Sequence, residues 1–498
     1  MLATPTATPN FKSRQVEGAE SALQTIGTPV VLMALLLLFS HLQDYVSALH
    51  LPLILLTICL MTATMSGGLY RTLVESRTGR YLTALTVFFA ISVVFSVWRG
   101  GSYGIFTGLW LKSYGIYIVV AALLTTMTKV VRAMWFSVIG MFWTALSALF
   151  LGRIDQGRLS TEDGRFGDPN DLAQILIIGT CLACALLCRK KTGWWGRGTM
   201  IVALCAMWVA GAKTGSRGGF IGALIVAAVL FFQSSVAGKV RMVLACLMLT
   251  FLAITLIPRG ILNRYLSVLG DDSAQQELTS AESGSAESRK YLLTQSLYVT
   301  AQHPLTGVGL GMFANAEDTA AKSQGMLHGS WHETHNMYTQ VSSEAGLPAL
   351  FCFIAAFVYG FKNVNFVCRA AKSSQDPVIQ DAGTFAFWMR LALIGLASTG
   401  FFLSVAYAPE PMILLAMTVA LQRAVRVRMA TAPVTALGRT QVRVASVPAA
   451  LPRNVQFSST AVTNGAMSEV AEKTPSFATN RKSRGWRCGV VPTFRKSS

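Results

Sequence analysis

Residues 170–188 read NDLAQILIIGTCLACALLC, and the basic run Arg189-Lys190-Lys191 follows directly. A helix needs about 20 mainly apolar residues to cross the hydrocarbon core of a bilayer, and this stretch has that length and composition. Inside a bilayer the backbone polar groups must pair with one another, and a helix achieves this within a single segment. The stretch is therefore predicted to be a transmembrane α-helix.

The same signal recurs along the chain, whose 498 residues are 52% hydrophobic and 13% charged. Soluble domains carry about 25% charged residues, and disordered chains are poor in apolar residues, so both classes are excluded for most of the chain. Eleven further apolar stretches are predicted to span the bilayer: 28–42, 49–66, 81–98, 106–127, 133–151, 198–212, 216–234, 240–257, 346–361, 385–407 and 410–423. We therefore expect an all-α polytopic membrane protein with about twelve transmembrane helices.

The distribution of Lys and Arg predicts the orientation of the chain in the membrane. With the N-terminus inside, the inner loops carry twice as many Lys and Arg residues as the short outer loops. Because basic loops stay on the cytoplasmic side, both termini are predicted to be cytoplasmic. The net charge of +19 does not indicate nucleic-acid binding, because residues 424–498 alone hold 12 basic and 2 acidic residues.

Five segments follow from these spans. A cytoplasmic N-terminal segment covers 1–27, helices 1–9 cover 28–257, and helices 10–12 cover 346–423. Between them, 258–345 forms a long periplasmic loop, in which 288–302 is predicted to be helical, and 424–498 forms a basic, disordered cytoplasmic tail. Four of the six histidines lie in the long loop. Long loops in compact proteins are typically functional, so the catalytic residues are expected there.

Three polar clusters are predicted to lie on the outer face: RFGDPN at 165–170, TGSRGG at 214–219, and the long loop with Arg289 and WHETHN at 331–336. Arginines on the outer side oppose the positive-inside rule and so require a separate reason. The guanidinium group is suited to two-pronged phosphate binding, and histidine is a natural proton acceptor at neutral pH. The pattern predicts a lipid ligand that bears a diphosphate.

Four short segments occur in a defined order over roughly 165–360. They are Phe166–Asn170 (FGDPN), Ser216–Gly219 (SRGG), Arg289 followed by His303–Phe313 (HPLTGVGLGMF), and His335–Tyr338 (HNMY) with Glu344–Pro348 (EAGLP). Each is weak alone, but their joint order resembles the O-antigen ligase and O-antigen polymerase-like membrane proteins.

The resemblance implies a GT-C-like fold and an inverting, metal-independent glycosyltransferase that uses no cofactor. Such an enzyme moves a glycan from an undecaprenyl-diphosphate carrier to a lipid or glycan acceptor at the periplasmic face of the bacterial inner membrane. By position, Arg217 and Arg289 would hold the diphosphate and His335 would be the base. The expected substrate-binding residues are Arg165, Asp168, Asn170, Ser216, His303, Gly309, Asn336 and Glu344. A flippase and other glycosyltransferases are candidate partners.

Two alternatives stay open. Ala349-Leu350-Phe351 stands where the ligase signature ends in Gly-Thr-Thr, so ligation and polymerisation are both compatible with the sequence. The second interpretation of function is a transporter of a small anion or a glycolipid, because Arg390 lies inside a predicted span. No inverted repeat or mid-span acidic residue supports transport, and the enzyme is the preferred interpretation.

Overall fold

The computed structural model describes residues 27–45, 49–155, 157–162, 164–256, 259–266, 280–323 and 331–431. The chain divides into two units, and the described helices and strands belong to the unit that contains Met1–Ala430. Of the predicted N-terminal segment, 1–27, all but Gly27 lies outside the described residues, as does the predicted tail from 432 onward. The first eight residues of that predicted tail, 424–431, are the end of a helix and not disordered.

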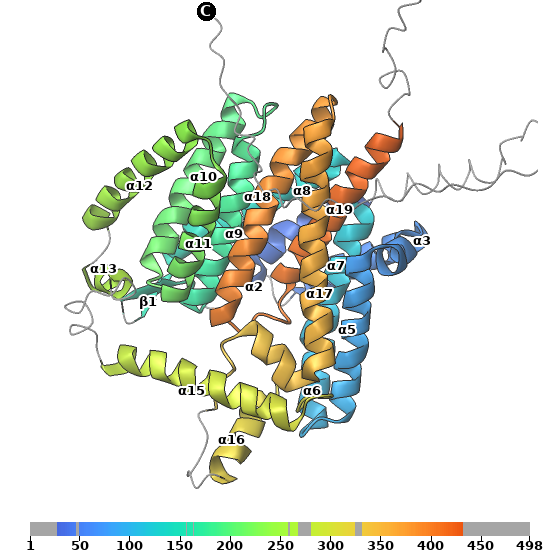
Figure 1. The fold of residues 1–498 in the computed structure, drawn as a ribbon, viewed down its shortest axis with the longest axis vertical. Helices are drawn as coiled ribbons and strands as arrows, with labels where there is room; N and C mark the ends of the chain where they lie inside the picture. The colour runs from blue at the N-terminus through green and yellow to red at the C-terminus, as the bar shows by residue number, and fades with distance from the viewer. Residues whose placement is uncertain are drawn as a thin grey trace, which may run out of the picture. The chain divides into compact units, whose positions relative to one another are not determined.

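Most of this unit is a bundle of helices (Figure 1). The long helices are Gly27–Phe39, α3 (Leu51–Met65), α5 (Arg77–Val94), α7 (Leu111–Leu123), α8 (Met127–Leu151), α9 (Pro169–Leu187), α10 (Trp194–Lys213), α11 (Arg217–Gln233), α12 (Val236–Leu256), α17 (Met337–Ser373), α18 (Pro377–Thr399) and α19 (Pro409–Thr431). Short helical segments adjoin them: α2 (Leu42–Tyr45), α4 (Gly68–Tyr70), η2 (Arg71–Glu75), α6 (Arg99–Ile105), η3 (Phe106–Trp110) and η5 (Gly400–Phe402).

Six helices of the described residues are long and apolar enough to cross a membrane. A seventh span results if α3 and the residues up to Glu75, which meet at a bend of 95°, count as one. Gly27–Phe39 and α11 are apolar but shorter. The protein is therefore a polytopic helical membrane protein. Each of the twelve predicted stretches falls on a helix, and their number as spans stays a prediction.

Local sequence signals fix where the helices begin. Asp168 caps α9, because its side chain accepts a hydrogen bond from the Asn170 backbone N–H and Pro169 takes the first helical position. Ser216 caps α11 in the same way by accepting from the Gly219 N–H. Both helices begin at the same end of the bundle, so the polar segments that precede them lie near each other.

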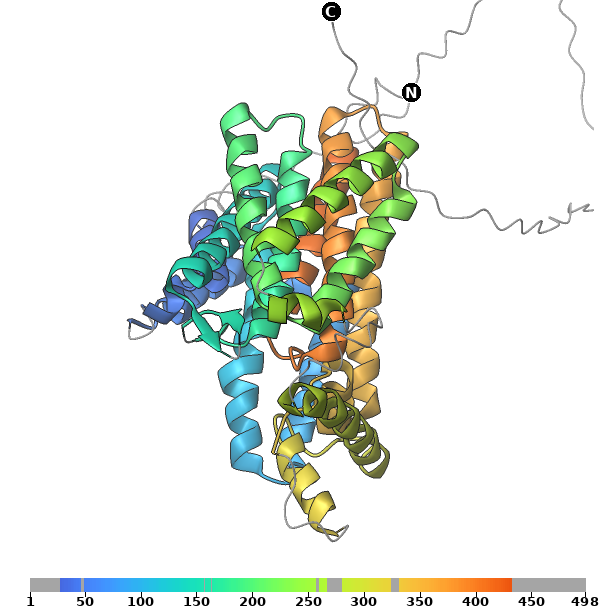
Figure 2. The same cartoon turned by 90° about the vertical axis from the view of Figure 1, so that its left-hand side faces the viewer.

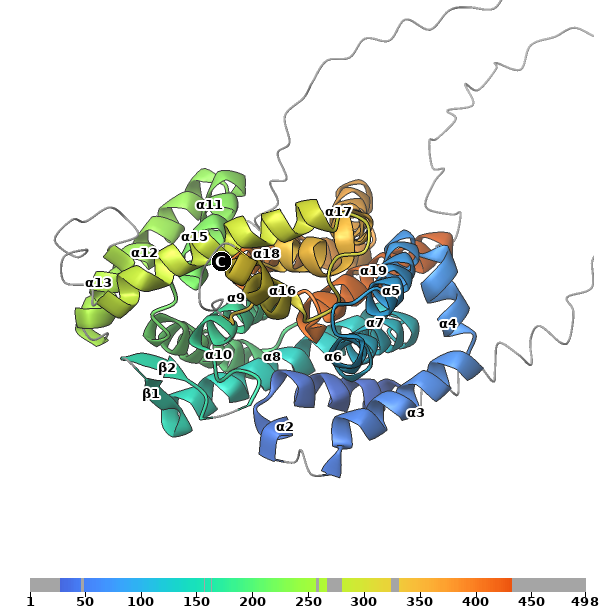
Figure 3. The ribbon, with the colours of Figure 1, turned by 90° about the horizontal axis from the view of Figure 1, so that it is seen from below.

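The predicted long loop is largely folded at this end of the bundle. It contains α13 (Arg259–Leu266), α15 (Ser280–Gln302) and α16 (Phe313–Ser323), and the antiparallel pair β1 (Arg153–Asp155) and β2 (Arg158–Ser160) lies nearby (Figure 2). The predicted helix at 288–302 is present and begins eight residues earlier, at Ser280. Seen from below, α15 runs across the ends of the bundle helices (Figure 3).

Helix α17 is broken near its start. Gly346 has φ 86° and ψ 172°, so the nine residues before it form a separate helical segment, and the predicted span at 346–361 begins at this break. The backbone N–H of Leu347 donates to the Pro304 carbonyl over 2.7 Å. The turn after α15 is thereby held against the break in α17.

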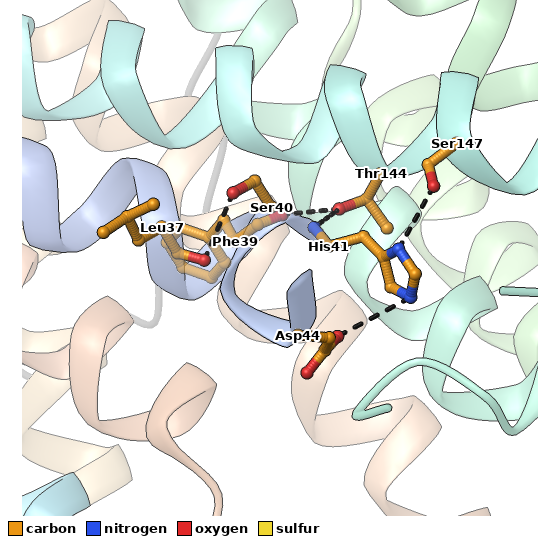
Figure 4. A network of polar contacts seen from close by, with 7 residues as sticks. All are labelled: Leu37, Phe39, Ser40, His41, Asp44, Thr144 and Ser147. Carbon is orange, nitrogen blue, oxygen red and sulfur yellow. Dashed lines mark hydrogen bonds and ion pairs between the residues drawn. The ribbon is translucent and has the colours of Figure 1, made fainter. Parts of the chain in front are cut away.

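A buried polar network fixes the end of the first helix to α8 (Figure 4). The Thr144 hydroxyl donates to the Phe39 carbonyl over 2.8 Å and accepts from the His41 backbone N–H over 3.1 Å. The His41 ring lies between the Ser147 hydroxyl, at 3.2 Å from Nδ1, and Asp44, at 3.6 Å from Nε2. Buried polar groups need such partners, so the network holds this turn in place.

Candidate active site

Four arginine side chains lie together where α9 and α11 begin. Arg158 belongs to β2, Arg217 is the first residue of α11, and α13 and α15 supply Arg264 and Arg289. Burial and the positive charges of the other three lower the pKa of Arg264 to about 10. A Cβ atom at Gly215 would come within 3.6 Å of both Arg158 and Arg264, so these two side chains flank the same turn.

The turn between α10 and α11 holds these arginines through its backbone. Arg158 Nε donates to the Thr214 carbonyl over 3.0 Å, and Arg264 Nε donates to the Gly215 carbonyl over 3.3 Å. Gly215 has φ 58°, a left-handed conformation that glycine adopts without steric cost. The TGSRG segment therefore builds a tight turn whose carbonyl groups orient two guanidinium groups.

Positive charge dominates this cluster. Burial and the charges of Arg158 and Arg217 lower the pKa of Arg289, while Asp168 acts in the opposite direction. Among the described residues, Arg289 forms no ion pair with a carboxylate. Burial is the larger cause of the lowered pKa of Arg289 and the repulsion between like charges the smaller one, and a bound anion would offset both. The cluster is suited to bind a multiply charged anion such as a diphosphate.

The side chains of Asn170 and Ser216 link the start of α9 to the start of α11 beside the arginine cluster. The Asn170 side-chain carbonyl accepts from Arg158 Nη2 over 2.9 Å and from the Ser216 hydroxyl over 2.7 Å. Two predicted substrate-binding residues, one in the first turn of α9 and one at the cap of α11, are thus hydrogen-bonded to each other, and Asn170 also binds an arginine. Their observed contacts position the cluster.

His335 lies beside this cluster. Burial, the charge of Arg289 and the nearby His332 lower the pKa of the His335 imidazole, and Asp168 partly opposes them. The His335 backbone has φ 49°, and its N–H donates to the Ser404 hydroxyl over 2.9 Å. A non-glycine residue in this conformation is uncommon, and such strain is concentrated at functional sites. The half-buried imidazole therefore lies near the guanidinium groups, and its lowered pKa favours the neutral form of the ring.

The next residue, Asn336, is the cap of α17. Its side-chain carbonyl accepts from the backbone N–H groups of Tyr338 and Thr339, over 2.9 and 3.2 Å. The capping role at this helix start is therefore filled without His335. Asn336 is buried, and its contacts fix the backbone that presents the histidine.

Residues 201–354 match the family described as O-antigen ligase. They form an O-antigen ligase domain. The match includes Arg217, Arg264, Arg289 and His335, and the resemblance predicted from the sequence is confirmed. The family of this domain is that of ligase- and polymerase-type membrane enzymes of polysaccharide biosynthesis. No curated protein gives a significant match to the chain.

Two predicted substrate-binding residues of the O-antigen ligase domain lie in its packed interior. Glu344 is buried, and its carboxylate accepts from the Gly311 backbone N–H over 2.7 Å and from the Tyr407 hydroxyl over 2.6 Å. The Glu344 carbonyl accepts from the Gly309 N–H over 2.9 Å. At Gly309, with φ 105°, a Cβ atom would lie 1.9 Å from the Ser96 hydroxyl. These contacts clamp the glycine-rich turn onto α17.

The remaining predicted residues lie apart from the arginine cluster. Arg165, which precedes the O-antigen ligase domain, pairs with Glu410 and lies over the Phe166 ring. His303 is exposed and directly follows Gln302, the last residue of α15, whereas Arg289 lies thirteen residues before that end. Arg390, on which the transporter interpretation depends, donates hydrogen bonds to the side chains of Asn365 and Gln233 at the other end of the bundle.

Arg158 and Arg264 are members of the arginine cluster that the sequence did not predict. Both lie in segments predicted to be on the outer side of the membrane. Arginine there opposes the positive-inside rule, and this is the sequence signal that could have indicated these two residues. Arg158 is one basic residue among several in the predicted outer loops, and Arg264 belongs to no motif of the predicted long loop. Their proximity depends on the β-hairpin and α13 folding back onto the Gly215 turn, which no local pattern encodes.

Proposed function

We propose that this protein transfers a glycan from an undecaprenyl-diphosphate carrier to a lipid or glycan acceptor at the periplasmic face of the bacterial inner membrane. The observation that supports this proposal best is the group of four guanidinium groups with one half-buried imidazole beside them. A diphosphate leaving group needs positive charge, and an attacking hydroxyl needs a base. Both requirements are met at one end of the helix bundle.

In the proposed reaction, the acceptor hydroxyl attacks the anomeric carbon from the face opposite the carrier. A new C–O bond forms to the acceptor while the C–O bond to the diphosphate breaks, so the anomeric configuration inverts. The proton of the acceptor hydroxyl passes to His335, and the electron pair of the broken bond goes to the diphosphate oxygen. Arg217 and Arg289 hold that diphosphate, and Arg158 and Arg264 add charge where it develops.

The pKa of His335 suits this role. A histidine with an unperturbed pKa near 6.5 is partly protonated at neutral pH, and a protonated ring cannot accept a proton. Burial and Arg289 lower the pKa of His335, so the ring is neutral and competent at lower pH. Turnover should therefore persist below pH 6.5 and fall as the medium becomes more acidic still.

Replacing His332 with glutamine tests this assignment. Because the charge of His332 helps to lower the pKa of His335, the variant should have a raised His335 pKa. The acidic limb of the kcat/KM profile, which reports the free enzyme, should then move to higher pH. A limb that stays in place or moves to lower pH would count against His335 as the base.

The architecture expected for this reaction has about twelve spans in a GT-C-like arrangement, with 28–257 and 346–423 in the membrane. Residues 258–345 would carry the periplasmic part of the site, and both termini would be cytoplasmic. A flippase would deliver the carrier-linked glycan, which other glycosyltransferases would have assembled. The acceptor, a lipid core or a growing glycan chain, contributes the attacking hydroxyl in either case.

Cysteine labelling tests the proposed orientation. Lys290 on α15 and Lys190 after α9 are both exposed, and they form a matched pair for replacement in a cysteine-free background. A membrane-impermeant maleimide applied from the periplasmic side should label Lys290→Cys and should leave Lys190→Cys unlabelled until the membrane is broken. The reverse pattern would place the arginine cluster in the cytoplasm and overturn the proposed reaction.

A further inference from the structure

A second cavity lies at the far end of α15, away from the arginines. Its volume is about 260 Å³, and it lies between the last turn of α15, α16 and the residues that follow α5. Arg289 and Gln302 are thirteen residues apart on one helix, which corresponds to about 20 Å along its axis. The cavity is therefore a site of its own.

The walls of this cavity combine an apolar floor with a neutral polar mouth. Val299 and Val308 form the buried floor and belong to the small core between α15 and α16. Tyr298 and Gln302, one turn apart on α15, and Thr319 on α16 lie at the mouth and are exposed. His303 and Ser323 complete the polar lining, and none of the described residues that line the cavity is Lys, Arg, Asp or Glu.

This composition indicates the class of ligand. A phosphate would need cations, and those lie around Arg289. A hydrocarbon chain would need apolar walls, such as those of the cavity of about 280 Å³ lined by Leu35, Leu38 and Leu56. A sugar ring has an apolar C–H face and a rim of hydroxyl groups. A tyrosine ring offers a flat apolar surface with a polar tip, and amide and hydroxyl groups both donate and accept hydrogen bonds.

The cavity is held rigidly to the bundle. The Val97 backbone N–H, after α5, donates to the Val308 carbonyl over 3.0 Å, and the Val308 N–H donates to the Ser343 carbonyl of α17 over 3.0 Å. A preformed site loses less entropy on binding than a flexible one. Its volume is slightly below the range of about 300–1,000 Å³ typical of sites for drug-sized ligands, which fits a single sugar ring.

We infer that this cavity binds an uncharged sugar ring of the glycan, as a saccharide subsite separate from the arginine cluster. The identity of the ligand as the enzyme's own glycan rests on the proposed function. The subsite would hold a distal part of the glycan while the reacting end lies at His335. Its loss should raise KM for the glycan substrate and leave kcat nearly unchanged, because it contributes binding equally to ground and transition states.

Direct binding to the full-length protein in nanodiscs tests the subsite without requiring turnover. The probes are neutral oligosaccharides that mild acid releases from the surface polysaccharide of the source cells, observed by saturation-transfer NMR. Tyr298→Ala and Gln302→Ala should each weaken binding about tenfold, which corresponds to about 1.4 kcal/mol. Leu297→Ala, an exposed neighbour on α15 outside the cavity lining, should bind like the wild type.

The outcomes separate the subsite from the reaction. Loss of saccharide binding in Tyr298→Ala and retention in Arg289→Lys would support the subsite even if no transfer were detected. Absence of saturable binding to the wild type, or equal binding by wild type and Tyr298→Ala, would overturn the subsite. Transfer by the same preparation would then leave the proposed function standing. Thermal unfolding of each variant checks that it is folded.

Discussion

Replacement of Arg289 by lysine should reduce turnover about 100-fold or more, although the positive charge is kept. Arg289 lies in a cluster with Arg158, Arg217 and Arg264 and forms no ion pair with a carboxylate of the described residues. A guanidinium group presents two parallel N–H donors to phosphate oxygens, whereas an ammonium group acts as a point charge. Removing one donor from a site of developing charge typically costs about 10²–10³ in rate.

Arg259 provides the matched control for this substitution. It is an exposed arginine at the start of α13, and Arg259→Lys should retain wild-type turnover. Initial rates of glycan transfer in proteoliposomes, normalised to the amount of inserted protein, measure both variants. Near wild-type turnover by Arg289→Lys would show that the two parallel N–H donors of Arg289 do not hold the leaving group.

Replacement of His335 by asparagine should lower turnover by about 10²–10⁴-fold and leave donor binding nearly intact. That range is the usual contribution of a positioned general base. Asparagine suits the test, because it adopts the left-handed backbone of His335 readily but cannot accept the proton at pH 7. The cap of α17 is Asn336, so the substitution leaves the helix start unchanged.

His50 provides a control with the same backbone geometry. His50 has φ 47°, close to the 49° of His335, and is exposed. His50→Asn should transfer glycan at the wild-type rate. Wild-type turnover by His335→Asn would show that the imidazole is not the base, and loss of donor binding in that variant would instead assign His335 a binding role.

The helices could be predicted from the sequence, because their signals are local. Apolar stretches of membrane length, the capping residues Asp168 and Ser216, and the helix-stopping pair His303-Pro304 all act within a few residues. The exact ends could not be predicted. α15 begins at Ser280, in a stretch with few apolar residues. The helix is stabilised because its later residues pack against α17.

The site could be predicted only in part. Arginines on the predicted outer face indicated an anion, and the structure groups Arg217, Arg289 and Asp168 with His335. Arg264 could not be placed, because its position depends on α13 folding back onto a turn about fifty residues earlier in the chain. Sequence could not distinguish polar residues that face a substrate from those that hold the scaffold. Burial and hydrogen bonds make that distinction for Glu344.

The most direct test of the central claim is a measurement of products from purified protein in liposomes given a glycan on undecaprenyl diphosphate and a hydroxyl acceptor. We expect glycosylated acceptor and free undecaprenyl diphosphate in equal amounts, with inverted anomeric configuration and no effect of chelators, since arginines supply the positive charge. Intact carrier-linked glycan moved across the bilayer, or inactivation by a chelator that a divalent cation reverses, would contradict the claim.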